Sequence, residues 1–145
     1  MNLHWRKMKM KKVVKFRGSS LASAAQFKKV GDIIRKDPSR RYVVPSAPGK
    51  RFKDDTKVTD MLYGCYAAAV KEKKFTEQLG QIKERYQEII DGLGLDFSLD
   101  EDFDTIRVDF SKKIGRDYAA SRGEYLNGKV MAAYLGFDFV DAAEV

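Results

Sequence analysis

The sequence predicts an α/β fold in which helices cover a small parallel sheet. Two short apolar runs, residues 13–16 and 42–44, have the composition of β-strands. Between them lies a segment whose apolar residues repeat at helical spacing, and two strands joined through a helix form a parallel pair. Most of the remaining chain shows helical spacing as well. Strands therefore alternate with helices, as they do in α/β proteins.

The first strand and the first helix are joined by a glycine-serine turn. Lys12–Phe16 forms the strand, and Gly18 follows with two serines. Ser23 begins a Ser-x-x-Gln capping box, in which the serine side chain caps the start of a helix. We therefore expect a helix from Ser23 to about Lys36, which Asp37-Pro38 ends because proline cannot continue it.

The second strand, Arg41–Ala47, contains a proline. Pro45 has no N–H to donate to a ladder, so we expect it at a sheet edge or a bulge. A basic loop, Pro48 to Asp55, follows the strand. Its positive charge suits either an anion or plain solvation, and the sequence alone leaves both interpretations open.

Four more helices and a third strand are expected in the rest of the chain. Apolar residues recur every three to four positions, and Gly92 and Gly136 stand where glycine caps a helix C-terminus. The expected helices are Thr56 to about Lys74, Thr76–Asp91, a helix from the capping box Ser98–Glu101 to Ile114, and roughly Asp117–Leu135. Phe137–Asp141 has the alternation of a strand.

Length and composition describe one globular domain. The chain has 145 residues, 43% hydrophobic and 34% charged, which is typical of a folded protein. No apolar run approaches the roughly 20 residues that span a bilayer, and residues 1–10 lack the apolar segment of a secretory signal. The single Cys65 excludes an internal disulfide and suits a reducing compartment. We therefore expect a buried thiol in a cytoplasmic protein without a membrane partner.

The net charge of +7 is concentrated in the first part of the chain. Residues 1–60 contain 17 Lys and Arg against 5 Asp and Glu, whereas residues 61–145 contain 11 against 16. A basic half is compatible with nucleic acid or with phosphate-bearing ligands. The basic residues are scattered over strand, helix and loop without interleaved aromatic residues, which argues against nucleic-acid binding.

A single histidine restricts the chemistry. His4 stands alone near the N-terminus, so neither a metal site nor a Ser-His-Asp arrangement is expected. Phosphoryl transfer remains the natural class, because it asks the protein mainly for positioning and positive charge. Lys15 precedes the Gly-Ser turn, where backbone N–H groups turn toward an anion. The alternative is an ordinary strand-to-helix turn with a solvated lysine.

Three stretches carry a family resemblance. They are Lys15–Ser20, then Val44–Lys50 leading into Thr56–Asp60, and finally Ser121–Lys129. In this order they resemble motifs of the aspartate kinases, in the amino-acid kinase superfamily, whose opening motif is Lys-Phe-Gly-Gly-Ser/Thr-Ser. The resemblance runs from about residue 12 to residue 145. It covers only the first part of such an enzyme.

The resemblance implies a fold and an activity. The fold is a three-layer αβα sandwich of the amino-acid kinase type, incomplete at the C-terminal side, with residues 12–145 as the N-terminal part of the catalytic domain and residues 1–11 as a basic, disordered leader. The activity is ATP-dependent phosphorylation of the aspartate side-chain carboxylate, which opens lysine, threonine and methionine biosynthesis. Mg²⁺ is bound through the nucleotide phosphates, and the full-length family forms homo-oligomers.

Matching residues receive their roles from the same resemblance. The residues that match ATP phosphate contacts are Lys15, which is also the catalytic residue, Gly18 and Ser19. The residues that match aspartate contacts are Ser46, Thr59 and Glu124, the last of which faces the amino group of aspartate.

These residues also have ordinary interpretations. Glu124 is expected to pair with Arg122 or Lys129 if it is only a surface side chain. Ser46 and Thr59 are then a strand-end hydroxyl and a helix-start hydroxyl.

Arg17 departs from the family pattern, because it replaces the first glycine of the opening motif. If this position needs a positive φ or close approach to phosphate, arginine introduces strain and blocks space. We expect impairment, and an added phosphate contact is the alternative. For the whole chain, the alternatives are a non-catalytic aspartate-kinase fragment that binds aspartate or a partner chain, and a basic nucleic-acid-binding domain.

Overall fold

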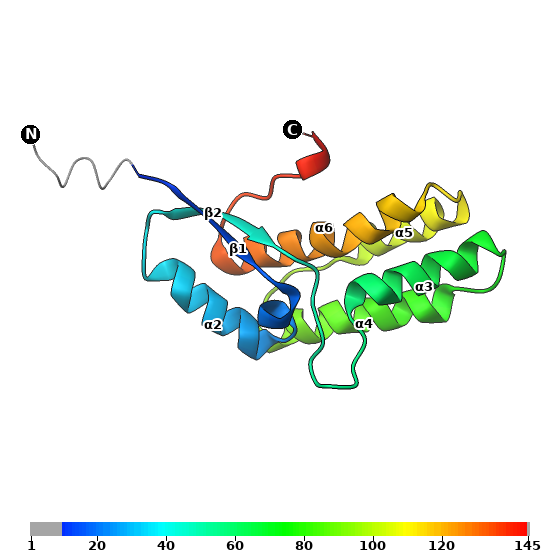
Figure 1. Ribbon diagram of the computed structural model, residues 1–145, viewed down its shortest axis with the longest axis horizontal. Coiled ribbons are helices and arrows are strands. Elements are labelled where there is room, and N and C mark those ends of the chain that lie inside the picture. Colours follow the sequence, from blue (N-terminus) through cyan, green and yellow to red (C-terminus); the bar gives the residue numbers. More distant parts are fainter. Residues whose placement is uncertain (1–9, 145) are drawn as a thin grey trace, which may run out of the picture.

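The computed structural model describes residues 10–144 and contains a two-stranded sheet beside a bundle of helices (Figure 1). The expected leader, residues 1–11, lies almost wholly outside the described residues. In chain order the elements are β1 (Lys12–Phe16), η1 (Gly18–Leu21), α2 (Ala24–Arg35), β2 (Arg40–Pro45), α3 (Val58–Val70), α4 (Thr76–Gly92), α5 (Asp100–Ser111), α6 (Arg116–Leu135) and η2 (Ala142–Glu144). The strands β1 and β2 are parallel and α2 connects them, so the predicted α/β class is confirmed.

The sheet contains only β1 and β2 among residues 10–144, so the predicted third strand at Phe137–Asp141 is wrong. This segment packs against α6 instead. The Phe139 ring lies edge-on against Tyr125, with ring centroids 5.5 Å apart. Gly128 leaves room for it, since a Cβ added there would lie 3.0 Å from Phe139 Cε2. Phe139 therefore covers part of α6, whereas Phe137 and Val140 stay 40% and 68% exposed.

Pro45 ends β2 with its nitrogen at the free edge of the sheet. Ser46 N–H donates to Phe16 O at 3.1 Å, and alternate residues of a parallel strand bond toward opposite sides. The Pro45 nitrogen therefore points away from β1, and the expected edge position is confirmed. The register irregularity of the pair lies at Lys12–Val13, at the other end of the strands.

The helix ends agree with the sequence in part. Ser23 caps α2 as predicted, its Oγ accepting a hydrogen bond from Gln26 N–H at 3.3 Å. Gly136 caps α6 in the left-handed conformation, also as predicted (φ 71°). Gly92, in contrast, belongs to the last turn of α4 and does not cap it. The helix α5 ends before Ile114, which is left 49% exposed.

The core lies between α2, the helices α3–α6 and the inner face of the sheet. The helix α6 packs against β2 and α3, and α4 packs against both α2 and α3 (Figure 1). Cys65 is buried as predicted, and burial raises the pKa of its thiol to about 11. Across residues 10–144, no helix has both the length and the apolarity to cross a membrane. The largest fully buried side chains include Leu21, Phe27, Ile34, Leu62, Ile82, Tyr86, Phe110 and Leu126.

Candidate functional site

A groove of about 400 Å³ opens beyond the carboxyl ends of β1 and β2, where the start of α3 and the middle of α6 approach the sheet. Crevices at this end of parallel strands are common ligand sites in α/β proteins. The groove is lined by Arg17, Gly18, Ser19, Ser46, Ala47, Pro48, Gly49, Lys50, Lys57, Thr59 and Glu124.

The groove brings together five of the residues singled out in the sequence. They are Gly18, Ser19, Ser46, Thr59 and Glu124. Lys15 is not among the lining residues and lies exposed on β1, opposite Val44 in the register. Because side chains alternate along a strand, Lys15 shares its face with Arg17, which does line the groove.

Backbone segments approach one another closely along one wall of the groove. Gly49 N–H donates to Gly18 O at 2.8 Å, and a Cβ added to Gly18 would lie 2.7 Å from Ala47 O. A Cβ added to Gly123 would lie 2.6 Å from Ala47 Cβ. Space requires glycine at these positions, because a side chain would push the segments apart.

Arg17 has an ordinary extended backbone, so the strain considered for this position is absent. Its φ is −79° and its ψ is 161°, a conformation that any residue adopts. The glycine with no room for a side chain is the next residue, Gly18. Arg17 is exposed and adds a positive charge to the lining of the groove.

Glu124 is the one acidic residue of the groove lining. Its two expected surface partners are bound elsewhere, since Lys129 forms a salt bridge of 2.7 Å with an aspartate of α5 and Arg122 stacks on two tyrosines of α6. Within residues 10–144, no salt bridge involves Glu124. A carboxylate is therefore left for a cationic group in the groove. The basic residues around it are Arg17, Lys50 and Lys57.

Two buried side chains hold the backbone behind the groove through hydrogen bonds. Asn127 of α6 donates from Nδ2 to Ser46 O at 2.7 Å, and Tyr86 of α4 donates its hydroxyl to Gly123 O at 2.8 Å. Both side chains are fully buried. Burial raises the pKa of Tyr86 well above its ordinary value, so the hydroxyl stays a neutral donor.

Arg85 of α4 supports the loop between β2 and α3. Its guanidinium donates to Gly49 O at 2.7 Å and to Thr56 O at 2.8 Å. Sequence reasoning missed Arg85, Asn127 and Tyr86 as site-supporting residues. A signal was present for Arg85, because it follows Ile82 by three positions and precedes Ile89 by four, on the apolar stripe of α4.

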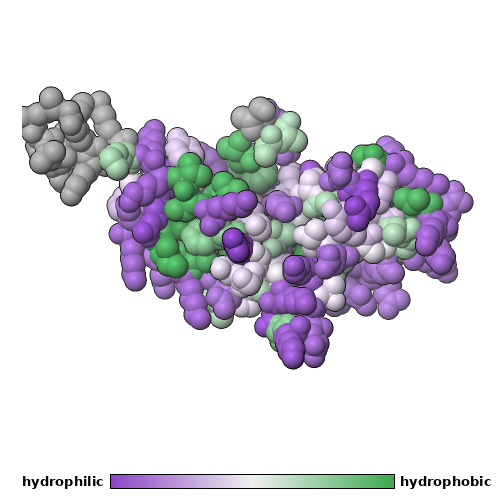
Figure 2. Space-filling view, in the orientation of Figure 1, coloured by the Kyte–Doolittle hydropathy of each residue, from purple (hydrophilic) through white to green (hydrophobic). Residues whose placement is uncertain are grey.

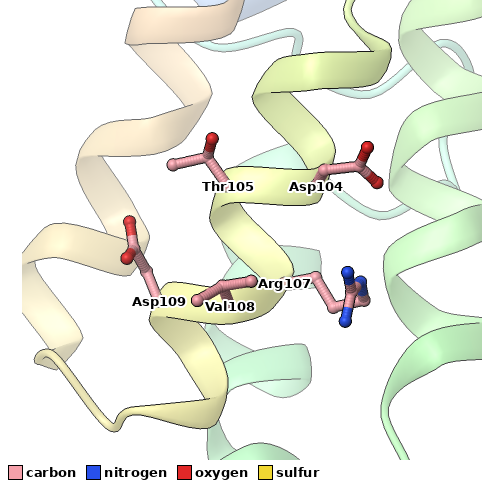
Figure 3. A pocket seen from close by; sticks show the side chains of 5 residues that line it. All are labelled: Asp104, Thr105, Arg107, Val108 and Asp109. Atoms are coloured by element: carbon pink, nitrogen blue, oxygen red, sulfur yellow. The ribbon is translucent and has the colours of Figure 1, made fainter.

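A second hollow, of about 320 Å³, lies on the outer surface of α5 and lacks converging polar groups. Figure 3 shows its lining side chains, all from this one helix and pointing in different directions. They are Asp104, Thr105, Arg107, Val108 and Asp109. In the part of the chain that the structure describes, no group of three or more metal-ligating side chains comes together.

Comparison with known proteins relates the chain to aspartokinases. No protein-family model matches. The chain is 41% identical over 140 residues to aspartokinase 3 of Bacillus subtilis, a match that covers 92% of the chain and 31% of that relative. The crystal structure of Clostridium acetobutylicum aspartate kinase superposes with a TM-score of 0.87 at 47% identity, again over 92% of the chain and 31% of that structure.

A more distant structure shares the fold alone. Escherichia coli aspartokinase III in complex with aspartate and ADP matches with a TM-score of 0.67 at 22% identity, over 86% of the chain and 28% of that structure. The chain thus spans less than a third of the length of these relatives.

Proposed function

The chain is homologous to aspartokinases over 92% of its length, and on this premise we propose that its groove is part of the aspartate- and ATP-binding site of an aspartate kinase. The proposed reaction transfers the γ-phosphoryl group of ATP to the side-chain carboxylate of aspartate, the first step toward lysine, threonine and methionine. The observation that carries the proposal is the meeting of Ser46, Thr59 and Glu124 beside Gly18 and Ser19 in one groove.

Aspartate recognition is assigned to three side chains. The Glu124 carboxylate binds the ammonium group of aspartate through a charge-assisted hydrogen bond, and the Ser46 and Thr59 hydroxyls bind its carboxylates. The complex of Escherichia coli aspartokinase III with aspartate and ADP supports these two ligands for this fold.

Phosphate binding is assigned to the turn after β1. As the first residues of η1, Gly18 and Ser19 have N–H groups without a partner in that helix. Lys15 and Arg17 add positive charge on the same strand face. A carboxylate oxygen of aspartate forms the new bond to the γ-phosphorus while the bond to the ADP oxygen breaks, so ADP leaves with the electron pair.

The groove fits a magnesium ion that is held mainly by the nucleotide. Glu124 is its one acidic lining residue, and Mg²⁺ in such sites is usually bound by substrate phosphates and water with few protein carboxylates. When bound there, the ion supplies neutralisation of the phosphate charge.

A non-catalytic aspartate-binding role is the second candidate. It is favoured by the position of Lys15, which lies outside the groove lining, whereas all three residues assigned to aspartate lie inside. An ATP-dependent hydroxamate assay separates the two candidates when the chain is fused to the remaining part of a relative such as aspartokinase 3, because the chain alone spans only 31% of that relative. Aspartate binding without aspartyl hydroxamate selects the non-catalytic role.

Calorimetry with L-aspartate and the variant Glu124→Gln tests the proposal. The substitution keeps the shape of the side chain and removes its charge, so aspartate affinity is expected to fall by about 1.5–3 kcal/mol. Glu84→Gln, at an exposed position of α4, is the matched control and should bind as the unaltered chain does. An equal affinity in the Glu124 variant, or no aspartate binding by the unaltered chain, contradicts the proposal.

A further inference from the structure

The loop formed by residues 49–56 is the central part of the connection between β2 and α3, and it projects from the body of the molecule (Figure 1). In Figure 2 this projection is the strongly hydrophilic feature at the lower edge. Its start contributes Gly49 and Lys50 to the groove lining, and Lys57 and Thr59 follow directly after its end. The relative position of two groove walls therefore depends on how this loop is held.

Arg85 of α4 bonds to both ends of the loop. Its Nη2 donates to Gly49 O at 2.7 Å, and its Nη1 donates to Thr56 O at 2.8 Å. The side chain is only 4% exposed. One rigid planar group thus fixes two backbone carbonyls that lie at opposite ends of the loop.

Asp55 of the loop balances the charge of two arginines. Its Oδ2 lies 2.8 Å from Arg51 Nε and 3.5 Å from Arg85 Nη1. The hydrogen bond from Arg51 holds the pKa of Asp55 below its ordinary range. A buried guanidinium is costly unless it is paired and hydrogen-bonded. The oxygen partners of Arg85, two backbone carbonyls and the Asp55 carboxylate, all come from the loop itself. Burial of the Arg85 side chain therefore depends on the loop keeping this conformation, and the loop conformation depends on Arg85.

We propose that Arg85 is a positioning residue for the groove. By bonding Gly49 and Thr56 it sets the separation between the wall at Gly49–Lys50 and the wall at Lys57–Thr59. Arg85 is not part of the groove lining, so it acts through the loop and touches no ligand. Its effect on aspartate rests on the proposed function, whereas its effect on the loop does not.

Trypsin tests the effect on the loop, because the loop offers cleavage sites after residues 50, 51 and 53. Arg85→Met removes both hydrogen bonds, and Arg85→Lys keeps the charge but reaches fewer carbonyls. Lys83→Met is the matched control. It also removes a positive charge from α4, but this charge is paired with Asp100 of α5 and not with the loop. Mass spectrometry measures loop cleavage relative to cleavage after Lys73 and Lys74, in the exposed turn after α3.

The loop-cleavage ratio should rise about tenfold in Arg85→Met, less in Arg85→Lys and not in Lys83→Met, because cleavage follows local opening. Aspartate affinity, measured by calorimetry, should fall about tenfold in Arg85→Met and partly recover in Arg85→Lys. Circular dichroism should show unchanged helix content.

Two results overturn the proposal. One is an unchanged loop-cleavage ratio in the Arg85 variants, and the other is an unchanged aspartate affinity beside increased loop cleavage. If Arg85→Met does not fold, the loop-cleavage ratio and the aspartate affinity of Arg85→Lys test the proposal instead. Absence of aspartate binding in the unaltered chain overturns the proposed function, and the cleavage ratio still decides whether Arg85 holds the loop.

Discussion

Lys15 is assigned a phosphate-binding role but lies outside the lining of the groove. It lies exposed on β1 beside the groove but not in its lining. The strand alternation places it on the face of Arg17, about 6.6 Å back along the chain. A lysine side chain spans such a distance, so Lys15 is suited to a phosphate that extends out of the groove toward β1.

Replacing Lys15 with alanine is expected to weaken ADP binding and leave stability nearly unchanged. A charge-assisted contact contributes about 1.5–3 kcal/mol, whereas substitution of an exposed side chain changes stability by roughly 0.5 kcal/mol or less. Calorimetry with ADP and thermal melting measure the two effects. Lys28→Ala, at an exposed position of α2, is the control. Equal ADP affinity in Lys15→Ala and the unaltered chain refutes the phosphate role.

Single residues of the groove lining were predictable from the sequence, but their supports were not. Ser46 and Thr59 lie in the second of the three stretches that resemble family motifs and Glu124 lies in the third, and the structure brings them together. Asn127 lies close to Glu124 in the chain, but its hydrogen-bond partner is Ser46, 81 positions earlier. No local pattern indicates a contact at that separation, because it exists only when α6 packs behind β2.

The helices α3 and α5 end in the same way, each followed by a non-glycine residue with a left-handed backbone. Glu72 has a φ of 57° and Lys113 a φ of 56°, and their side chains form a salt bridge of 3.1 Å. A left-handed conformation costs a residue other than glycine about 1–2 kcal/mol. Both helix ends therefore keep strain that glycine would remove.

Lys113→Gly is expected to raise the free energy of unfolding by about 0.5 kcal/mol. Relief of the left-handed backbone outweighs the loss of an exposed salt bridge, which is worth about 0–1 kcal/mol. Urea denaturation measures the change. The neighbouring Lys112 has a right-handed backbone (φ −82°), so Lys112→Gly should destabilise the protein by about 0.5–1 kcal/mol. A loss in Lys113→Gly as large as in Lys112→Gly contradicts the argument.

Helices and strands were predictable where the local sequence alone determines the secondary structure. The strands β1 and β2 and the cap of α2 by Ser23 follow from local patterns, and all three are present. The segment Phe137–Asp141 has the same alternation, but among the described residues it pairs with no strand. Alternation indicates which side chains would share a face of a strand. It does not show what lies against that face, and here Phe137 and Val140 remain exposed.

On the outer face of the two-stranded sheet, beside the exposed Lys15, lie apolar side chains that no described element covers. Val13, Tyr42 and Val44 are 68%, 52% and 46% exposed, respectively. Figure 2 shows hydrophobic residues gathered on this side, over the region where Figure 1 places the strands. An apolar face beside open strand edges is a surface on which chains associate.

The isolated chain is expected to self-associate and to make no aspartyl hydroxamate, since it spans 31% of its relatives. Size-exclusion chromatography measures the first property and the hydroxamate assay the second. The double variant Val13→Thr/Val44→Thr should elute as a smaller species, because it reduces the apolar face. Val70→Thr/Val108→Thr, which changes two exposed valines on α3 and α5, is the control. A monodisperse, active monomer contradicts both expectations.

The α/β class of the whole molecule follows from its first 45 residues, whereas the packing of the later helices does not. Each of α3–α6 has an apolar face, and periodicity predicts that this face is buried. The partner of each face is set by contacts between distant segments, such as α3 against α6 and α2 against α4. The groove exists only as a result of these contacts, because its walls come from separate parts of the chain.

The close contact of Gly18 with Gly49, together with Gly123 against Ala47, limits how the groove can be redesigned for another amino acid. Backbone atoms fill the space that a side chain would need at Gly18 and at Gly49, and the Ala47 side chain fills it at Gly123. A mutational library at the three positions would return mostly misfolded chains. Selection for a different ligand would instead act on the exposed basic residues of the groove, where size, charge and reach are free to vary. They are Arg17, Lys50 and Lys57.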